Sequence, residues 1–297
     1  MADGRFAPSP TGDLHLGNLR TALLAWLFAR SAGSRFLVRV EDLDTGRVRP
    51  GIADRQLADM AALGIDWDGA VVSQSERTAL YEGALSRLEA DGLVYPCYCT
   101  RAEIREAASA PQGVPAEGAY PGTCRRLTAA ERSDREAAGR RPALRLRAGG
   151  DEVAFEDRLI GRHADVVDDF VLRRNDRAFA YNLAVVVDDA DQGIEEVVRG
   201  ADLVDSTPRQ LHLTRLLGLP EPAYAHVPLM LGPDGARLAK RHGAVTLADR
   251  DESPAEILSE IAASVGLCEP GEPVTPVALV ERFDPARIPT RATTAKL

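Results

Sequence analysis

Several features that mark other classes of protein are missing from this chain of 297 residues. No stretch of about twenty apolar residues occurs, so a membrane-spanning helix is not expected. The opening Met-Ala-Asp-Gly-Arg leads directly into a predicted strand and leaves no room for a signal peptide, which favours a cytoplasmic protein without membrane contact. The pattern Gly-x-x-x-x-Gly-Lys-Ser/Thr is absent as well, which excludes a P-loop nucleotide site.

Lysine is nearly absent, and acidic residues outnumber basic ones by 45 to 36. The formal net charge is −9, which by itself argues against a nucleic-acid-binding protein. Of the 36 basic residues 34 are arginine, so a lysine at any chosen basic position is improbable by chance, and Lys240 therefore stands out. Arginines in the middle of the chain form either a basic face that neutralises phosphates or ordinary solvated helix faces. They are Arg125, Arg126, Arg140, Arg141, Arg145 and Arg147.

Only four cysteines occur, and three of them lie between residues 97 and 124. Disulfides are not expected in a cytoplasmic protein, so a structural zinc site is the preferred interpretation, and buried cysteines without metal are the alternative. Zinc requires a fourth ligand, and His163 is the nearest histidine in sequence. Cys268, far along the chain, is predicted to be a core thiol.

Strand-like and helical patterns alternate along the chain, which predicts an α/β fold. Apolar residues make up 45% of the sequence, and its length allows one large domain or two smaller ones. Strands are predicted at 35–40, 143–147, 153–155, 170–174, 197–203 and 227–232. Helices are predicted at 51–64, 76–92, 128–140, 207–217, 254–265 and 276–282.

The N-terminal segment from Arg5 to Asn18 is predicted to form a short strand, a tight turn and the first turn of a helix. Pro8 and Pro10 keep the chain extended after the strand, and Gly12 allows a sharp turn. Apolar residues at helical spacing follow at once, so a buried helix begins there. Because free N–H groups and the helix dipole point at the turn, this corner favours a phosphate.

Individual side chains near this corner suit a nucleotide and an amino acid. Gly17 lets a ligand approach the backbone, His15 can donate to a phosphate oxygen, and Asn18 can donate to a ribose or phosphate. Glu41 ends the predicted strand 35–40, at the edge where open α/β sheets bind ligands, so it could meet an ammonium group. Taken alone, a surface histidine and a helix-capping or turn glutamate are the ordinary alternatives.

The whole string Arg-Phe-Ala-Pro-Ser-Pro-Thr-Gly-x-Leu-His-x-Gly-Asn resembles the signature of class I glutamyl-tRNA synthetases, in which residues 15–18 form the HIGH element. The segment Arg-Leu-Ala-Lys-Arg resembles their KMSKS loop, with Lys240 as its second lysine, Arg237 replacing its first lysine and Ala239 replacing its serine. The resemblance extends over residues 5–266. It implies a Rossmann-like parallel sheet, an inserted acceptor-binding subdomain and a short helical C-terminal segment.

The resemblance also implies roles for single residues. His15 and Lys240 are the implied catalytic residues, which stabilise the transition state at the α-phosphate of ATP while Mg²⁺ bridges the phosphates. The implied ATP-binding residues are His15, Gly17, Asn18, Arg237 and Lys240. The implied glutamate-binding residues are Arg5, Ala7, Ser9, Glu41, Tyr181 and Arg199.

Among these synthetases the chain is most similar to the short glutamyl-queuosine tRNA(Asp) synthetases. They carry a Cys-x-Cys…Tyr-x-x-x-Cys arrangement, which implies a zinc ion held by Cys97, Cys99, Tyr120 and Cys124. The implied reaction forms glutamyl-adenylate from glutamate and ATP without requiring tRNA. Glutamate then passes to queuosine in the anticodon loop of tRNA(Asp).

Four segments are predicted: 1–94 and 179–235 as the two halves of the catalytic domain, 95–178 as the insertion, and 236–297 as the KMSKS-like loop with a helical segment. Glutamyl-tRNA synthetases continue into an anticodon-binding region where this chain stops, and we expect a monomer. Three other functions remain open. They are a short glutamyl-tRNA synthetase that charges tRNA(Glu), a small-molecule adenylate-forming ligase, and a non-catalytic tRNA-binding paralogue.

Overall fold

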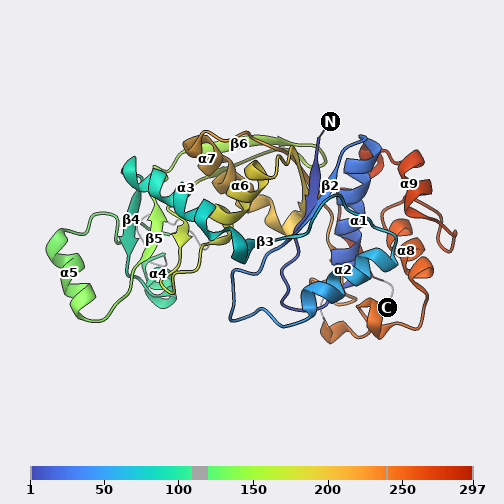
Figure 1. Cartoon of the computed structure of the whole chain (residues 1–297), viewed down its shortest axis with the longest axis horizontal. Helices are drawn as coiled ribbons and strands as arrows, with labels where there is room; N and C mark the ends of the chain where they lie inside the picture. The colour runs from blue at the N-terminus through green and yellow to red at the C-terminus, as the bar shows by residue number, and fades with distance from the viewer. Residues whose placement is uncertain (1, 109–119, 239, 296–297) are drawn as a thin grey trace.

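A seven-stranded sheet in the order β3-β2-β1-β9-β10-β6-β7 runs through the molecule (Figure 1). The computed structural model describes residues 2–108, 120–238 and 240–295. Within the sheet, neighbouring strands are parallel except for the antiparallel pair β6-β7, so the predicted α/β fold with a mostly parallel sheet is confirmed. Its strands are β1 (Gly4–Phe6), β2 (Phe36–Val40), β3 (Val72–Ser73), β6 (Glu152–Asp157), β7 (Gly161–Val166), β9 (Glu196–Gly200) and β10 (Ala223–Val227).

Two hydrophobic cores cover the two faces of the sheet, because successive residues of a strand point to opposite sides. Val198 belongs to the core around α1, and its neighbour Val197 belongs to the core around α6 and α7. The first core includes α1 (Leu16–Ser31), α2 (Ile52–Ala62), α8 (Pro254–Ala263) and α9 (Pro276–Arg282). The second includes α3 (Thr78–Ala90), α6 (Tyr181–Asp191) and α7 (Thr207–Leu217).

The chain reverses its direction of winding in the middle of the sheet. From β1 it proceeds to β2 and β3 on one side, whereas β9 and β10 lie on the other side of β1. In open α/β sheets such a reversal leaves a crevice at the carboxyl ends of the two central strands, which is the usual place for a ligand. The segments after β1 and β9 therefore define where a site is expected.

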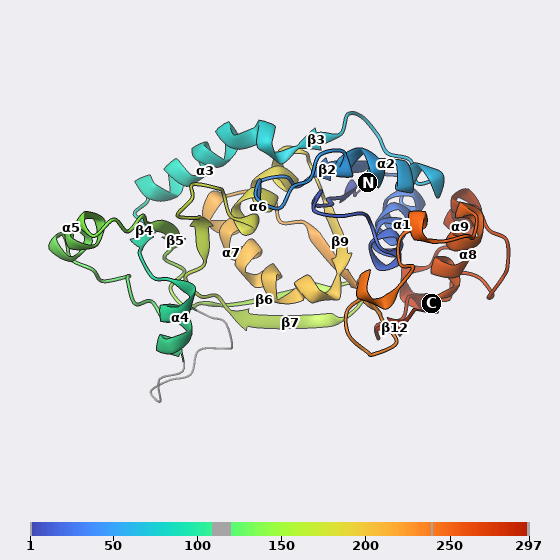
Figure 2. The same ribbon diagram turned by 90° about the horizontal axis from the view of Figure 1, so that it is seen from below.

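The strands between α3 and α6 belong to two different sheets. β4 (Val94–Cys97), β5 (Ala143–Leu146) and β8 (Val171–Arg173) form a separate antiparallel sheet, accompanied by α4 (Arg101–Ala108) and α5 (Ala129–Ala137), at the left of Figure 2. The β6-β7 hairpin instead pairs with β10 of the large sheet. Residues 152–166 thus do not lie with the rest of the predicted insertion, and the segment limits as a whole stay a prediction.

Two further differences concern strands near the C-terminal half. The strand predicted at 227–232 does not form as one strand: only its first residue belongs to β10, which ends at Val227, and the separate short strand β11 (Met230–Leu231) follows. Pro228 lies between them, and since proline lacks an N–H group it cannot continue a central strand. β11 pairs with β12 (Thr293–Thr294). Strand β7 was not predicted, and its sequence, Gly-Arg-His-Ala-Asp-Val, lacks an alternation of apolar and polar residues.

None of the described helices combines the length and the apolar character needed to cross a bilayer. The predicted helices at 51–64, 76–92, 128–140, 207–217, 254–265 and 276–282 all form, with ends that differ by a few residues. The compartment and the oligomeric state stay predictions.

Candidate active site

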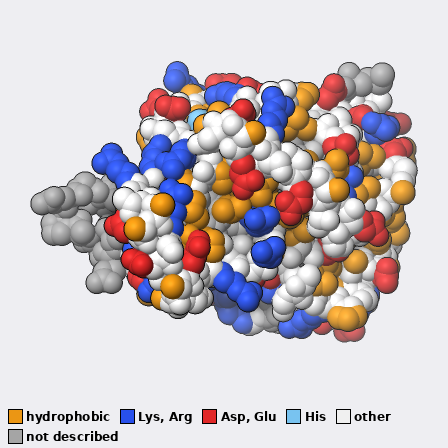
Figure 3. All heavy atoms as spheres, turned by 60° about the vertical axis from the view of Figure 1, so that its left-hand side comes forward, with side chains coloured by type: hydrophobic (Ala, Val, Ile, Leu, Met, Phe, Trp, Pro, Cys, Tyr) orange, Lys and Arg blue, Asp and Glu red, His pale blue; other side chains and the backbone are white. Residues whose placement is uncertain are grey.

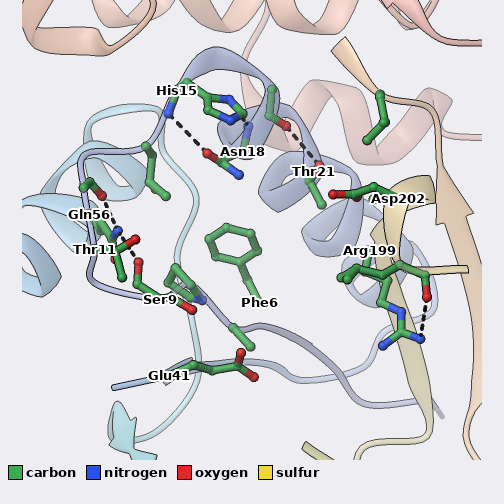
Figure 4. Close-up of a pocket in the computed structure, with 18 of the residues that line it drawn as sticks. Phe6, Ser9, Thr11, His15, Asn18, Thr21, Glu41, Gln56, Arg199 and Asp202 are labelled. Atoms are coloured by element: carbon green, nitrogen blue, oxygen red, sulfur yellow. Dashed lines mark hydrogen bonds between the residues drawn. The ribbon is translucent and has the colours of Figure 1, made fainter. Parts of the chain in front are cut away.

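A cavity of about 560 Å³ opens at the carboxyl ends of β1 and β9 (Figure 4). The turn after β1, with Ser9 and Thr11, lies on one side of it, and Arg199 of β9 lies on the other. His15 and Glu41 lie at opposite ends in this view. The predicted residues that line this one cavity are Arg5, Ala7, Ser9, His15, Gly17, Asn18, Glu41, Tyr181, Arg199 and Arg237.

His15 occupies the residue before α1 and caps the helix. Its Nδ1 accepts the backbone N–H of Asn18 at 3.2 Å, while the Asn18 side chain accepts the backbone N–H of His15. In the neutral ring the proton must therefore sit on Nε2, which stays available as a donor. Burial, followed by the nearby Arg237 cation, lowers the pKa of His15 to about 4, so the ring is neutral at pH 7.

The start of α1 is shaped for close approach. A Cβ atom at Gly17 would meet the His15 ring at 3.1 Å and the Met230 side chain at 3.3 Å, so glycine is the residue that fits. The first turn of α1 carries no acidic side chain that would offset the positive end of the helix dipole. These properties suit a bound phosphate.

A buried ionic network lies beneath the other end of the cavity. Arg5 forms a two-pronged contact with Asp189 of α6, at 3.2 and 3.1 Å. Arg39 of β2 contacts the same carboxylate at 2.8 Å and reaches Glu41 at 3.4 Å. The charge of Arg5 is thereby matched by a carboxylate. Burial raises the pKa of Glu41, and the Arg39 and Arg5 cations oppose that rise.

Arg199 differs from Arg5, because its partners are all neutral. Its Nε donates to His226 at 3.1 Å and its Nη1 to the Gln210 oxygen at 2.7 Å. The remaining contacts of Arg199 go to the Tyr181 hydroxyl, the Thr207 hydroxyl and the Leu203 carbonyl. Among the described residues no carboxylate forms an ion pair with it, although it is only 4% exposed. A buried cation without a counter-ion favours an anionic ligand.

The structure describes only part of the KMSKS-like segment. Arg237 lines the cavity and pairs with Asp202 at 2.6 Å. Lys240 begins a short 3₁₀ turn, Lys240–His242, but its side chain and the whole of Ala239 lie outside the described residues. The role of Lys240 therefore stays a prediction.

Some residues that build the site were not predicted from the sequence. Gln56 donates to the carbonyls of Ser9 and Gly12 and so holds the turn after β1. Arg39 and Asp189 fix Arg5. One signal was available for Arg39, which is a charged residue inside an apolar strand and must have a buried partner.

A wider cavity of about 1110 Å³ adjoins the first and shares Ser9, Glu41 and Tyr181 with it. It extends to Cys97 and Cys99 of the insertion. Figure 3 shows basic and acidic side chains interspersed around the hollow on this side of the molecule. The arginines among its lining residues are Arg101, Arg140, Arg141, Arg145 and Arg174.

The mid-chain arginines do not form one continuous basic face. Arg145 is buried and stacks on the Tyr120 ring at 3.7 Å, and Arg147 lies over Tyr95 at 4.7 Å. Arg140 pairs with Glu103. Several of these side chains therefore hold the insertion together.

Three cysteines of the insertion converge at one point, where the Sγ atoms of Cys97, Cys99 and Cys124 all lie within 4.8 Å of one another. The Tyr120 hydroxyl lies 3.3 Å from the Cys97 sulfur and 3.6 Å from that of Cys99. This buried, sulfur-rich donor set fits a metal ion of the zinc type. His163 is not part of it, since it lies on β7 near Asp205. Cys268 is half-buried and packs against the core around α1.

Comparisons with known proteins agree with this geometry. The family described as class I tRNA synthetases (E and Q), catalytic domain, matches residues 2–272. A protein from Nocardia farcinica named Glutamyl-Q tRNA(Asp) synthetase is 61% identical over 96% of this chain and 90% of its own length. A protein of the same name from Symbiobacterium thermophilum is 54% identical over 97% of this chain and 94% of its own length.

A solved structure supports the same assignment. A glutamate tRNA ligase from Elizabethkingia meningosepticum, crystallised with its amino acid, superposes with a TM-score of 0.84 at 25% identity. The match covers 99% of this chain and 66% of that ligase, so the chain spans about two thirds of its length. The chain thus belongs to the class I tRNA synthetases for E and Q, in the branch that contains the glutamyl-Q tRNA(Asp) synthetases.

Proposed function

We propose that this chain activates L-glutamate with ATP and transfers the glutamate to queuosine in the anticodon loop of tRNA(Asp). The observation that carries the activation of glutamate is the cavity between β1 and β9. There Arg199 has no carboxylate partner among the described residues, and Glu41 lies nearby. Glutamate carries two carboxylates and one ammonium group, and this arrangement of charges complements it. The names of the two relatives at 61% and 54% identity support the transfer of glutamate to queuosine.

The amino acid is held by the residues around Arg199 and Glu41. Arg199 would pair with a carboxylate of glutamate, since a guanidinium binds a carboxylate with two parallel hydrogen bonds. All five N–H groups of Arg199 already have acceptors, so the two longest contacts, to the Tyr181 hydroxyl at 3.3 Å and the Leu203 carbonyl at 3.4 Å, would be exchanged for the ligand. Glu41 would accept the ammonium group. Arg5, Ala7, Ser9 and Tyr181 complete this part of the cavity.

ATP occupies the end of the cavity at α1. His15 would donate from Nε2 to the α-phosphate, Gly17 and Asn18 would contact the nucleotide from the start of α1, and Arg237 and Lys240 would neutralise the phosphates. Mg²⁺ would arrive bound to the phosphates of ATP and neutralise charge on the departing pyrophosphate.

Both chemical steps are displacements that need positioning more than proton transfer. A carboxylate oxygen of glutamate attacks the α-phosphorus, the bond to the β-phosphate oxygen breaks, and pyrophosphate leaves. No base is required, because the carboxylate is already ionised at pH 7. A hydroxyl of the queuosine diol then attacks the glutamyl carbonyl, AMP leaves, and the hydroxyl proton passes to solvent. Catalysis then rests on proximity and on stabilised charge.

The insertion would hold a structural zinc ion through Cys97, Cys99, Cys124 and Tyr120. The wider cavity between this insertion and the amino-acid pocket would admit the RNA, since it shares Ser9, Glu41 and Tyr181 with that pocket. Zinc would supply a fixed tetrahedral centre for the chain around it.

The test is transfer of labelled glutamate to a set of matched RNAs. Queuosine-containing tRNA(Asp) should be labelled, and so should the same RNA after removal of its 3′-terminal adenosine. An unmodified tRNA(Asp) transcript with an intact 3′ end should stay unlabelled. Together, these RNAs show whether glutamate is attached to the queuosine diol or to the 3′ end.

Two outcomes would contradict the proposal. Labelling that disappears with the 3′ adenosine would place glutamate at the 3′ end. Labelling of tRNA(Glu) instead of tRNA(Asp) would favour a short glutamyl-tRNA synthetase. That second function has some support, since a protein from Halorhodospira halophila named Glutamate–tRNA ligase 1 is 44% identical over 96% of this chain and 63% of its own length.

A further inference from the structure

A hydrogen-bonded chain of three side chains links three strands of the large sheet: Asp157 at the end of β6, His226 of β10 and Arg199 of β9. His226 Nδ1 lies 2.7 Å from an Asp157 oxygen, and His226 Nε2 lies 3.1 Å from Arg199 Nε. The side chains of Asp157 and His226 are both fully buried. The residues predicted to hold the amino acid include Arg199 but neither Asp157 nor His226.

The hydrogen bonds fix the position of the proton on His226. Arg199 Nε always carries a proton and can only donate, so His226 Nε2 must be an acceptor. The ring proton therefore sits on Nδ1 and is donated to Asp157. The Thr207 hydroxyl lies 3.2 Å from the same Nε2 and accepts from Arg199 Nη2 at 2.8 Å, which helps to fix the orientation of the guanidinium.

Asp157 is held in place by its own surroundings. Its carboxylate accepts the backbone N–H groups of Leu159 and Ile160, at 2.9 and 3.1 Å, and that of His226. Burial acts to raise the pKa of Asp157, but the hydrogen bond from the His226 ring, followed by those from the Leu159 and Ile160 N–H groups, holds it below its usual range. Burial lowers the pKa of His226, although the hydrogen bond to Asp157 opposes this, so a neutral ring fits the arrangement.

A neutral ring between the two ions has a consequence for charge. Asp189 contacts Arg5 directly and neutralises it. Asp157, by contrast, acts on Arg199 only through an uncharged imidazole. The guanidinium of Arg199 is thereby oriented by five contacts while its charge remains available to a ligand.

We propose that Asp157 and His226 are positioning residues that aim the Arg199 guanidinium at a carboxylate of the bound amino acid. This inference rests on the proposed function, because it assigns the amino acid to Arg199. It also gives a role to the pairing of the β6-β7 hairpin with the large sheet, because this pairing places Asp157 beside Tyr224, near the start of β10. The alternative is that the three side chains only tie the strands together.

The decisive variant is Asp157→Asn. The asparagine amide can donate a hydrogen bond to His226 Nδ1, which would move the ring proton to Nε2. The Nε2–H group would then face the Nε–H group of Arg199, and two donors cannot form a hydrogen bond. We expect the KM for glutamate in ATP–pyrophosphate exchange to rise by about tenfold or more, the usual effect of losing a hydrogen bond to a charged group. The KM for ATP should stay within a factor of about two, because the ATP residues are not in this chain of contacts.

A pair of substitutions at His226 provides the rescue. His226→Gln can still present an amide oxygen to Arg199, whereas His226→Leu cannot. The KM for glutamate should therefore be much lower in the Gln variant than in the Leu variant. His212→Gln is the matched control, since His212 is a buried histidine of α7 without a hydrogen bond to Arg199 and its KM values should match the parent.

If Asp157→Asn changes the KM for glutamate and the KM for ATP equally, or changes neither, the inference is overturned. Asp157 and His226 would then have a purely structural role. If Asp157→Asn fails to fold in thermal unfolding, the Gln and Leu variants decide, and equal KM values for glutamate overturn the inference. An absence of glutamate-dependent exchange in the parent protein would contradict the proposed function instead.

Discussion

Two buried arginines at the site have opposite electrostatic environments. Arg5 and Arg199 are each 4% exposed, yet within the described part of the chain Arg5 alone of the two has a carboxylate partner. Removing Arg5 leaves Asp189 with one cation in place of two, whereas removing Arg199 takes away a charge that nothing in the described protein balances. The two residues should therefore respond differently to the same substitution.

Substituting glutamine at each arginine tests this difference. Arg5→Gln should lower the free energy of unfolding by about 3 kcal/mol, because it breaks a buried ion pair. Arg199→Gln should leave that free energy nearly unchanged but raise the KM for glutamate by about 10- to 100-fold. Urea unfolding and ATP–pyrophosphate exchange measure the two effects. Strong destabilisation by Arg199→Gln with an unchanged KM would show that Arg199 is a structural residue.

A second prediction at the residue scale concerns the proton on His15. NMR titration of the unliganded protein should give a pKa of about 4 for this ring, and Arg237→Gln should raise it toward 6.5. The unfolded chain takes up a proton between pH 6.5 and 4 that the folded chain does not. The contribution of His15 to the free energy of unfolding should therefore fall as the pH is lowered through that window.

The His15 signal can be identified by its loss in a His15→Gln variant. An ordinary pKa near 6.5 in the parent protein would contradict the environment described for His15. An unchanged pKa of His15 in the Arg237→Gln variant would contradict it as well.

At the scale of elements, the sequence predicts helices and strands well where their formation depends on residues that are close together in the chain. The strand, turn and helix at the N-terminus follow from prolines, glycines and apolar spacing that act over a few residues. The hairpin of β6 and β7 is the contrast. Its first strand was predicted, but its place beside β10 depends on a pairing with residues about seventy positions away, which no local pattern encodes.

The proposed zinc site in the insertion can be tested by substituting one of its cysteines. One zinc ion per chain is expected, and Cys124→Ser should lose it together with transfer of glutamate to RNA. Glutamate-dependent ATP–pyrophosphate exchange should survive, because the adenylation pocket is built mainly on β1, α1 and β9. Elemental analysis and the two activity assays measure these effects.

Cys268→Ser is the control, since Cys268 packs in the core around α1 and should keep the metal. Full zinc content in Cys124→Ser would exclude the three cysteines as the metal site. Loss of the exchange reaction along with zinc would show that the insertion supports the adenylation pocket as well.

At the scale of the whole molecule, the site consists of segments brought together from distant parts of the chain. Of the predicted site residues, Arg5, His15, Glu41 and Arg199 line one cavity, whereas the side chain of Lys240 lies outside the described residues. Motifs could identify residues that touch a ligand. They could not identify Asp189, Asp157 or His226, because those residues act through tertiary contacts between separate elements.

The measurement that tests the account most directly is ATP–pyrophosphate exchange with the purified protein in the absence of RNA. L-Glutamate should support exchange, whereas L-glutamine and L-aspartate should not. Under the proposed function Arg199 pairs with a carboxylate, which the glutamine side chain lacks and which the aspartate side chain holds one methylene closer to its backbone. No exchange with glutamate, or equal exchange with all three amino acids, would contradict the claim that this cavity activates glutamate.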